Sequence, residues 1–146
     1  MQLHYESANK DDFDFLKRIQ INYVLRNEDP TVVDLNQILQ RIEMNLKSNI
    51  ETYNKVFLDN VVVGYYRMVE NYDFSYDLSF LYVLKEYRNK GIGKEILMCL
   101  KQEADDPIQV NIFMKDSELY DFLENQDFYI KRIISKTRIL LQYDCL

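Results

Sequence analysis

Glycine, proline, histidine and cysteine are all scarce in this sequence of 146 residues, which has three glycines, two prolines, one histidine (His4) and two cysteines (Cys99 and Cys145). So few potential ligands argue against a structural zinc site, and no cysteine or serine pairs with a histidine in any motif. Cys99 lies in an apolar run, which is typical of a small buried hydrophobic residue rather than a nucleophile. We therefore expect a protein that uses no metal.

Long apolar runs and a basic excess are also lacking. No window approaches the roughly 18 uninterrupted apolar residues of a membrane helix, and the first residues do not have the pattern of a secretory signal. The 18 basic and 24 acidic residues give a net charge of −6. This balance disfavours nucleic acid and anionic membranes as partners and weakly favours a cationic partner. The sequence predicts a cytoplasmic soluble protein.

What is present is one uninterrupted succession of short periodic segments, which predicts a single domain over residues 1–146. A first strand is expected around His4. Apolar spacings of three and four predict a helix from Phe13 to about Arg26, for which Asp11 or Asp12 is a suitable cap. Further helices are expected over 32–48, 91–104 and 117–125, and strands over 53–58, 61–69, 75–83, 108–113, 128–134 and 137–142. The order β-α-α-β-β-β-α-β-α-β-β predicts an α+β fold with a mixed sheet, because the crossover from Ser75 to Phe113 requires a parallel pair.

The sharpest local feature is a basic loop with two glycines, Gly91 and Gly93, between the strand at 75–83 and the helix at 91–104. From Lys85 to Lys94 the charge is four basic minus one acidic residue, or +3, inside an acidic chain. A helix N-terminus with glycine and cations next to it is typical of a site for a phosphate or pyrophosphate. A solvated glycine turn is the simpler alternative. The spacing fits neither a dinucleotide-binding fingerprint, whose third glycine is Ile96 here, nor a Walker loop, because Glu95 follows Lys94.

The segment Arg88-Asn89-Lys90-Gly91-Ile92-Gly93 resembles motif A of the GCN5-related N-acetyltransferase (GNAT) superfamily, Arg/Gln-x-x-Gly-x-Gly/Ala. The resemblance extends to the order of elements, to Val63-Gly64-Tyr65 on the third strand, and to residues 117–128 in the place of motif B. It implies a mostly antiparallel twisted sheet of about seven strands flanked by four helices. It also implies an N-acetyltransferase that takes its acyl group from acetyl-CoA.

Carried over residue by residue, the resemblance implies three groups of cofactor contacts. The pyrophosphate would lie against the loop, the pantetheine arm against the strand before it, and motif B would contribute its first position. The contacts to the pantetheine arm are Leu81, Tyr82 and Val83, and the contribution of motif B is Asp116. The contacts to the pyrophosphate are Arg88, Asn89, Lys90, Gly91, Ile92, Gly93 and Lys94.

Motif B departs from the family pattern, which commonly reads Asn-x-x-Ala-x-x-Phe-Tyr-x-x-x-Gly-Phe. Leu123 stands at the position of the tyrosine that often protonates the leaving thiolate, and Asp127 stands for the glycine. Tyr120, three residues before Leu123, is a candidate substitute, although a tyrosine on this helix could simply cover the edge of the core. Solvent is the other source of the proton.

The general base is also carried over from the family, whose histone-acetyltransferase branch has a glutamate eleven residues before motif A. Asp77 stands at that position, and desolvation in a cleft would raise the pKa of its carboxyl toward that of a useful base. An ordinary exposed aspartate at a strand end is the alternative. Strand alternation predicts that Tyr76, Leu78, Phe80 and Tyr82 share one face and that Asp77 lies on the other.

The sequence leaves the acceptor open, beyond an expectation that it is an amine. Aromatic and acidic residues could receive a cationic amine; the candidates are Tyr23, Glu28, Asp29, Tyr65, Tyr66 and Arg67. The resulting hypothesis is an N-acyltransferase in which the amine attacks the thioester directly in a ternary complex. The rival is a non-catalytic coenzyme A-binding or protein-interaction module that keeps the fold. A homodimer is possible in either case.

Overall fold

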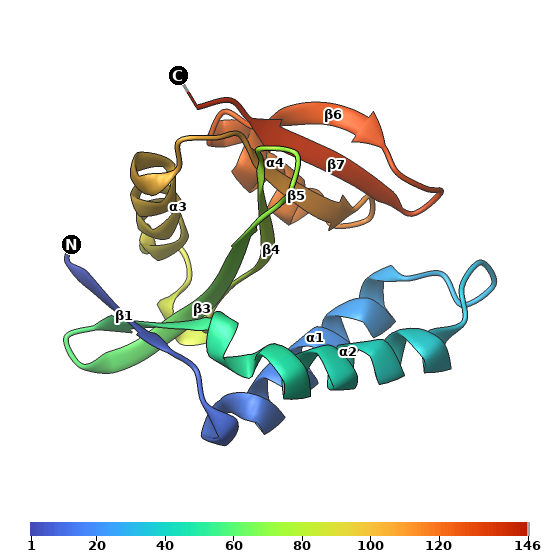
Figure 1. The fold of residues 1–146 in the computed structure, drawn as a ribbon, viewed down its shortest axis with the longest axis horizontal. Helices are drawn as coiled ribbons and strands as arrows, with labels where there is room; N and C mark the ends of the chain where they lie inside the picture. The colour runs from blue at the N-terminus through green and yellow to red at the C-terminus, as the bar shows by residue number, and fades with distance from the viewer. Residues whose placement is uncertain (146) are drawn as a thin grey trace.

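A computed structural model describes residues 1–145, and a single seven-stranded sheet organises them (Figure 1). The strands lie in the order β1-β2-β3-β4-β5-β7-β6, and only β4 and β5 pair in parallel. This mostly antiparallel sheet confirms the predicted α+β class. The strands are β1 (Leu3–Ser7), β2 (Asn54–Leu58), β3 (Val61–Glu70), β4 (Tyr76–Val83), β5 (Ile108–Phe113), β6 (Tyr129–Ile133) and β7 (Arg138–Tyr143).

Four α-helices cover the sheet, two on each face. They are α1 (Phe13–Asn27), α2 (Leu35–Asn49), α3 (Ile92–Glu103) and α4 (Ser117–Asn125), with 3-10 turns at Lys10–Asp12, Ile50–Thr52 and Lys85–Tyr87. The helices α1 and α2 run side by side as a helical hairpin, as Figure 1 shows. In the part of the chain that the structure describes, no helix combines the length and hydrophobicity needed to cross a bilayer.

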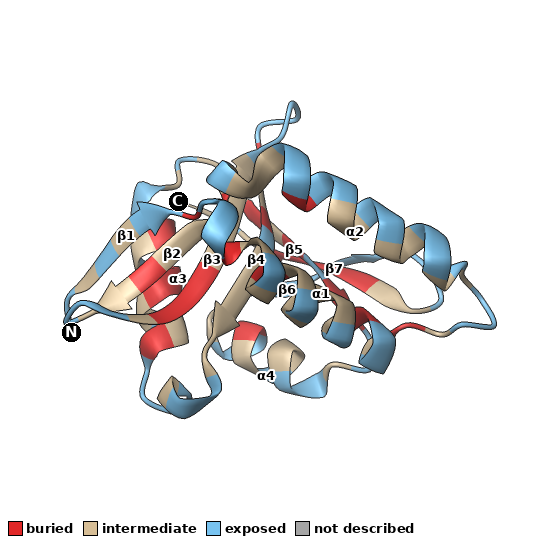
Figure 2. Cartoon of the chain, turned by 90° about the horizontal axis from the view of Figure 1, so that it is seen from below, coloured by how far each residue is buried: buried red, intermediate tan, exposed pale blue. Residues whose placement is uncertain are grey.

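The core has two parts, one on each face of the sheet. Buried side chains of α3 and α4 pack with β3, β4, β5 and β7 in the larger part, and a smaller cluster centred on Leu16, Leu46 and Tyr65 holds α1 and α2 (Figure 2). Cys99, which the sequence predicts to be buried, is only half-buried on α3. The helical hairpin therefore rests on a thinner apolar layer than α3 does.

A β-bulge in β4 changes which side chains share a face. Arg67 of β3 pairs with Phe80 and Met68 pairs with Leu78, so Ser79 is an extra residue in β4. Leu78 consequently packs in the core on the α3 side, whereas Phe80 packs in the cluster under α1 and α2. The prediction that Tyr76, Leu78, Phe80 and Tyr82 share one face is therefore wrong, because a bulge shifts the alternation of side chains by one residue.

The parallel strands β4 and β5 separate soon after they begin. Their pairing is limited to Tyr76 with Ile108 and Asp77 with Gln109. Beyond Asp77, the edge of β4 that faces β5 has no strand partner. The sheet thus opens between its fourth and fifth strands, and the opening widens toward the loop that leads into α3.

The first helix is tied to the sheet by Asp12 rather than capped by it. The Asp12 side chain makes no cap bond to α1 and instead accepts hydrogen bonds from the backbone N–H of Asn9 and from the Tyr65 hydroxyl, at 3.0 and 2.9 Å. Lys55 Nζ lies 3.0 Å from the same carboxylate. Burial acts to raise the pKa of Asp12, but these three partners outweigh it and leave the pKa below its ordinary value. The suggested capping role is therefore replaced by an anchoring one.

Candidate active site

The loop before α3 presents a row of free backbone N–H groups. Gly91 is the N-cap of α3 with a φ of +81°, in the left-handed region that favours glycine, and no side chain caps the helix. Within residues 1–145, no N–H from Asn89 to Lys94 has an intramolecular acceptor, and the first helical bond runs from Glu95 N to Gly91 O at 3.0 Å. With the positive end of the helix dipole, this row forms a cradle for an anion such as a pyrophosphate.

The backbone of β4 continues this cradle into the sheet. Leu84 N donates to Val63 O at 2.8 Å, whereas Val83 O accepts a bond from Arg88 Nε at 2.9 Å instead of one from β3. Since alternate residues of a strand direct their backbone groups to opposite edges, Leu81 and Val83 both point their N–H and C=O groups into the gap. These are the groups expected to bind an extended pantetheine arm.

Gly64 lets β3 come close enough to support that edge. A Cβ atom at this position would lie 2.5 Å from the carbonyl oxygen of Tyr82, which no side chain tolerates. The strands can therefore pair closely only with glycine there. The Arg88 guanidinium lies 5.1 Å from the centre of the Tyr82 ring, so the same strand also positions a cation beside the loop.

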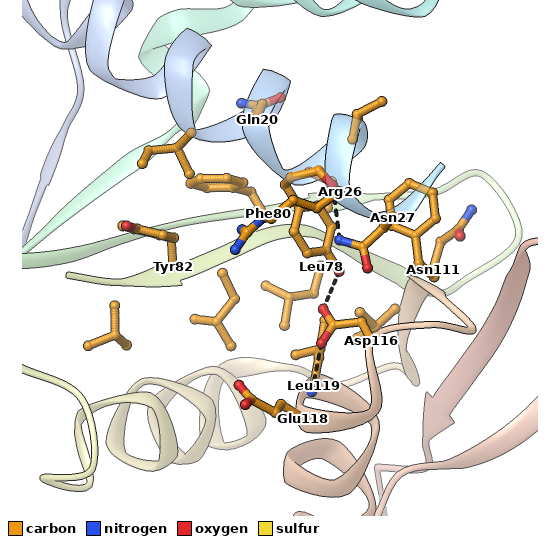
Figure 3. Close-up of a pocket in the computed structure, with 18 of the residues that line it drawn as sticks. Gln20, Arg26, Asn27, Leu78, Phe80, Tyr82, Asn111, Asp116, Glu118 and Leu119 are labelled. Atoms are coloured by element: carbon orange, nitrogen blue, oxygen red, sulfur yellow. Dashed lines mark hydrogen bonds between the residues drawn. The ribbon is translucent and has the colours of Figure 1, made fainter. Parts of the chain in front are cut away.

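A cavity of about 1680 Å³ occupies the opening between β4 and β5. It exceeds the roughly 300–1,000 Å³ typical of a site for one small ligand, so it has room for more than one. Figure 3 shows Tyr82, Asp116 and Leu119 on its wall. Lys90 is the one predicted cofactor residue that does not line it. Those that do are Leu81, Tyr82, Val83, Arg88, Asn89, Gly91, Ile92, Gly93, Lys94 and Asp116.

Asp77 lies at the point where β4 and β5 part, just outside the residues that line the cavity. Its side chain is on the face of the sheet that also carries Arg67 of β3, opposite to the face that carries Leu78. Burial raises the pKa of Asp77, and the charge of Arg67 opposes the shift. The pKa of Asp77 is thus shifted in the direction expected of a base, but Asp77 itself is not part of the cavity wall, which Leu78 and Ser79 line.

Tyr120 points away from the cavity. Its hydroxyl donates to Glu124 at 2.8 Å on the exposed side of α4, and the residue is not part of the cavity wall. Leu123, at the family's tyrosine position, is completely buried and does line the cavity. The geometry speaks against Tyr120 as an acid for the leaving group, because an inward rotation of α4 would have to displace Leu123.

Contacts between residues that are distant in the sequence close the end of the cavity that lies away from the loop before α3. The Tyr23 hydroxyl donates to Asp116, which also caps α4 by accepting from Leu119 N at 3.1 Å (Figure 3). Burial, followed by this bond, raises the pKa of Tyr23. Glu28 at the end of α1 accepts from Thr137 Oγ1 at 2.8 Å and lies 3.4 Å from the Arg138 guanidinium. These partners are about a hundred residues apart, so no local pattern could have revealed them.

The structure divides the acceptor candidates into two groups. Tyr23 and Glu28 line the cavity. The other four lie outside its wall and have other contacts: Tyr65 bonds Asp12, Tyr66 packs in the larger core cluster with α3, Asp29 accepts from Thr31, and Arg67 bonds Thr52 and Ser79. The part of the cavity that these two candidates line, between the hairpin of α1 and α2 and the elements β5, α4 and β7, is called the acceptor end below.

Comparison with known proteins gives one family and one fold. Residues 17–129 match the model of the acetyltransferase (GNAT) family. No curated protein matches the sequence significantly. An acetyltransferase from Thermus thermophilus superposes with a TM-score of 0.73 at 16% identity, covering 99% of this chain and 97% of that one. The PaiA N-acetyltransferase of Thermoplasma acidophilum, solved with coenzyme A, gives 0.65 at 15% identity and 99% coverage of both chains.

A third similar structure is YncA from Salmonella typhimurium with its cofactor acetyl-CoA, which gives a TM-score of 0.62 at 16% identity, over 100% of this chain and 95% of that one. At these identities the structural likeness establishes the fold alone. The family assignment rests on the match to the family model, which covers more than half of the chain.

Proposed function

The chain belongs to the GNAT family of acetyltransferases, and from this premise we propose that it transfers an acetyl group from acetyl-CoA to a primary amine within a ternary complex. The observation that carries the proposal is the unbroken path from the free N–H row at Asn89–Lys94, along the unpaired edge of β4, into a cavity with room for two substrates. Two structural neighbours contain coenzyme A or acetyl-CoA, which agrees with that use of the path.

The loop and β4 hold the acyl donor. The N–H groups of Asn89–Lys94 take the pyrophosphate, with Arg88 and Lys94 supplying positive charge. Leu81 and Val83 bond the pantetheine arm through their backbone. A free N–H of β4 near the bulge polarises the thioester carbonyl, because charge develops on that oxygen as the amine attacks.

The chemical step forms one C–N bond and breaks one C–S bond. The nitrogen lone pair of the neutral amine attacks the carbonyl carbon, and the electron pair of the C–S bond leaves on sulfur. Asp77, directly or through a water, removes the proton that the attacking nitrogen must lose. Holding both substrates in one cavity supplies the proximity that this attack needs.

The leaving thiolate takes its proton from solvent. Leu123 leaves no hydroxyl at the family's usual position, and the Tyr120 hydroxyl is bound to Glu124. A thiol has a pKa near 8.5, so its thiolate is protonated by water at neutral pH without a dedicated acid. This view requires only that the sulfur end of the cavity is open to water.

The test is release of thiol from acetyl-CoA in the presence of a panel of primary amines. Amine-dependent release that saturates with both substrates is the expected result. Binding of acetyl-CoA without release for any amine would favour the non-catalytic coenzyme A-binding alternative, for which the leucine at position 123 is the supporting observation. Neither binding nor release would reject both hypotheses.

A further inference from the structure

Two arginines of the helical hairpin line the acceptor end of the cavity without a charged partner. Arg26 is on the last turn of α1 and Arg41 is on α2, and both are exposed and part of the cavity wall (Figure 3 shows Arg26). Within residues 1–145, neither guanidinium forms an ion pair, a hydrogen bond or an aromatic contact. Glu43 of α2 is not available to them, because it forms ion pairs with Lys17 and Lys47 away from the cavity.

The carboxylates near these arginines already have partners. Glu28 is bound by Thr137 and Arg138, and Asp116 is bound by the Tyr23 hydroxyl and by the backbone of α4. Glu118 lines the cavity without a partner, but it lies in the first turn of α4, where the helix dipole offsets a negative charge.

The wall of the cavity that α1 and α2 form therefore has a net positive charge, although the protein as a whole is acidic. Its charged lining residues are Arg26, Arg41 and Glu28, and the charge of Glu28 is taken up by Arg138 of β7. Lys115, which follows β5, adds a further cation to the lining, and its charge also acts on Asp29 just beyond α1. A cationic amine with no other group would meet repulsion here, whereas a carboxylate or phosphate would meet two free guanidinium groups.

We propose that the acceptor is an amine that also carries an anionic group, a carboxylate or a phosphate, and that Arg26 and Arg41 bind this group. The inference rests on the proposed transferase function. It reverses the expectation, drawn from the net charge of −6 alone, that the acceptor is simply cationic. With its anion on the hairpin, the acceptor directs its amine away from α1 and α2, toward β4 and the thioester.

The experiment compares matched amines with and without the anion: O-phosphoethanolamine with ethanolamine, and lysine with cadaverine. Thiol release should give a kcat/KM at least tenfold higher for the anionic member of at least one pair. Arg26→Gln and Arg41→Gln should each reduce this preference about fivefold or more and leave the KM for acetyl-CoA unchanged. Raising NaCl should weaken the preference, since these cations are exposed.

The matched control is Arg18→Gln, an exposed arginine of α1 that stacks over Phe15 outside the cavity wall and should not change the preference. Equal or better use of ethanolamine and cadaverine by the wild type would overturn the inference. So would arginine variants that raise the KM for acetyl-CoA instead, because the guanidinium groups would then serve the cofactor phosphates.

Failure of the proposed function is a separate result. If no amine releases thiol, calorimetric titration of O-phosphoethanolamine and of lysine into the coenzyme A-saturated protein still tests the arginines. Binding of either compound that is lost in the Arg26→Gln, Arg41→Gln double variant and retained in Arg18→Gln supports the anion site. Absence of binding to the wild type for both compounds rejects it.

Discussion

Asp77 is the residue whose chemistry depends most on its surroundings. Burial raises the pKa of Asp77 above the ordinary aspartate value of 3.8, so the carboxylate that acts as base is lost as pH falls through this raised value. We expect kcat/KM to decline as the pH falls, with a midpoint at the raised pKa of Asp77. Asp77→Asn should lower kcat by about 100-fold or more and remove this limb of the pH profile. A variant with unchanged kcat would assign the proton to water alone.

The same substitution has the opposite effect on stability. Because the folded protein binds the Asp77 proton more tightly than the unfolded chain, the charged carboxylate lowers the free energy of unfolding at pH values above its raised pKa. Asp77→Asn should therefore keep or increase the urea midpoint at pH 7 while activity falls. A parallel loss of stability and activity would indicate a structural role for Asp77 instead.

For Tyr120, in contrast to Asp77, we expect no catalytic role. Its hydroxyl bonds Glu124 outside the cavity, so Tyr120→Phe should leave kcat for thiol release within about twofold, and Glu124→Gln serves as the control for the lost bond. A drop of tenfold or more for Tyr120→Phe alone, with a loss of the basic limb of the pH profile, would restore the acid role that its spacing suggested.

The geometry of the loop before α3 was predictable from sequence because motif A is local, whereas its role in binding a cofactor stays a prediction. A glycine with positive φ, free N–H groups and nearby cations all lie within Arg88–Lys94, and ten of the eleven predicted residues line the cavity. The contacts of Tyr23 with Asp116 and of Glu28 with Arg138 were not predictable. They depend on how two halves of the chain meet across the sheet, which no spacing along the chain records.

At the scale of elements, the strands and helices were predicted to within a few residues, but the bulge at Ser79 was not. Alternation of apolar residues assumes a regular strand, and Tyr76-Asp77-Leu78-Ser79-Phe80 reads as a regular one. The extra residue moves Phe80 and Tyr82 under α1, where Tyr82 contacts Phe15. The bulge also lies beside the proposed reaction centre, so the error in the prediction falls on a functional feature.

The contact of Glu28 with β7 is expected to stabilise the closed end of the cavity. The Glu28 side chain is 2% exposed and the Arg138 side chain 30%. Its loss removes the carboxylate partner of the Arg138 guanidinium and the acceptor 2.8 Å from the Thr137 hydroxyl. Glu28→Ala should therefore lower the free energy of unfolding by about 2 kcal/mol.

The matched control is Glu43→Ala, which removes only the exposed pairs with Lys17 and Lys47 and should cost less than about 1 kcal/mol. Urea denaturation of both variants measures the difference. Equal losses would show that the contact between α1 and β7 contributes no more than a surface ion pair.

The Asp12 anchor gives the hairpin a pH dependence. The pKa of Asp12 is lower in the folded protein than the 3.8 of the free side chain, so its stabilising effect is present above 3.8 and is lost as pH falls through the folded value. Asp12→Asn should therefore be clearly less stable than the wild type at pH 7, and the gap should narrow at pH 3. A gap that is constant between these pH values, measured by urea denaturation, would contradict the ion pair with Lys55.

At the scale of the whole molecule, positive charges gather at two places along the cavity instead of being distributed evenly over the surface. The chain carries −6, yet the loop from Lys85 to Lys94 is basic and the hairpin wall of the cavity presents Arg26 and Arg41. Both substrates of the proposed reaction would thus be anionic at the ends that the protein holds. Composition alone suggested a cationic partner, because it cannot show on which surface the acidic residues lie.

The central claim is that the loop before α3 binds acetyl-CoA, and calorimetric titration with acetyl-CoA tests it most directly. The wild type should bind with a micromolar Kd, and Gly91→Ala should weaken binding about tenfold or more, because a side chain is strained at a φ of +81° and disturbs the N–H row. The control is Asn60→Ala, which places an alanine at a φ of +66° in the turn between β2 and β3, away from the loop, and should bind like the wild type. No heat with the wild type, or equal affinity of the Gly91→Ala variant and the wild type, would contradict the account.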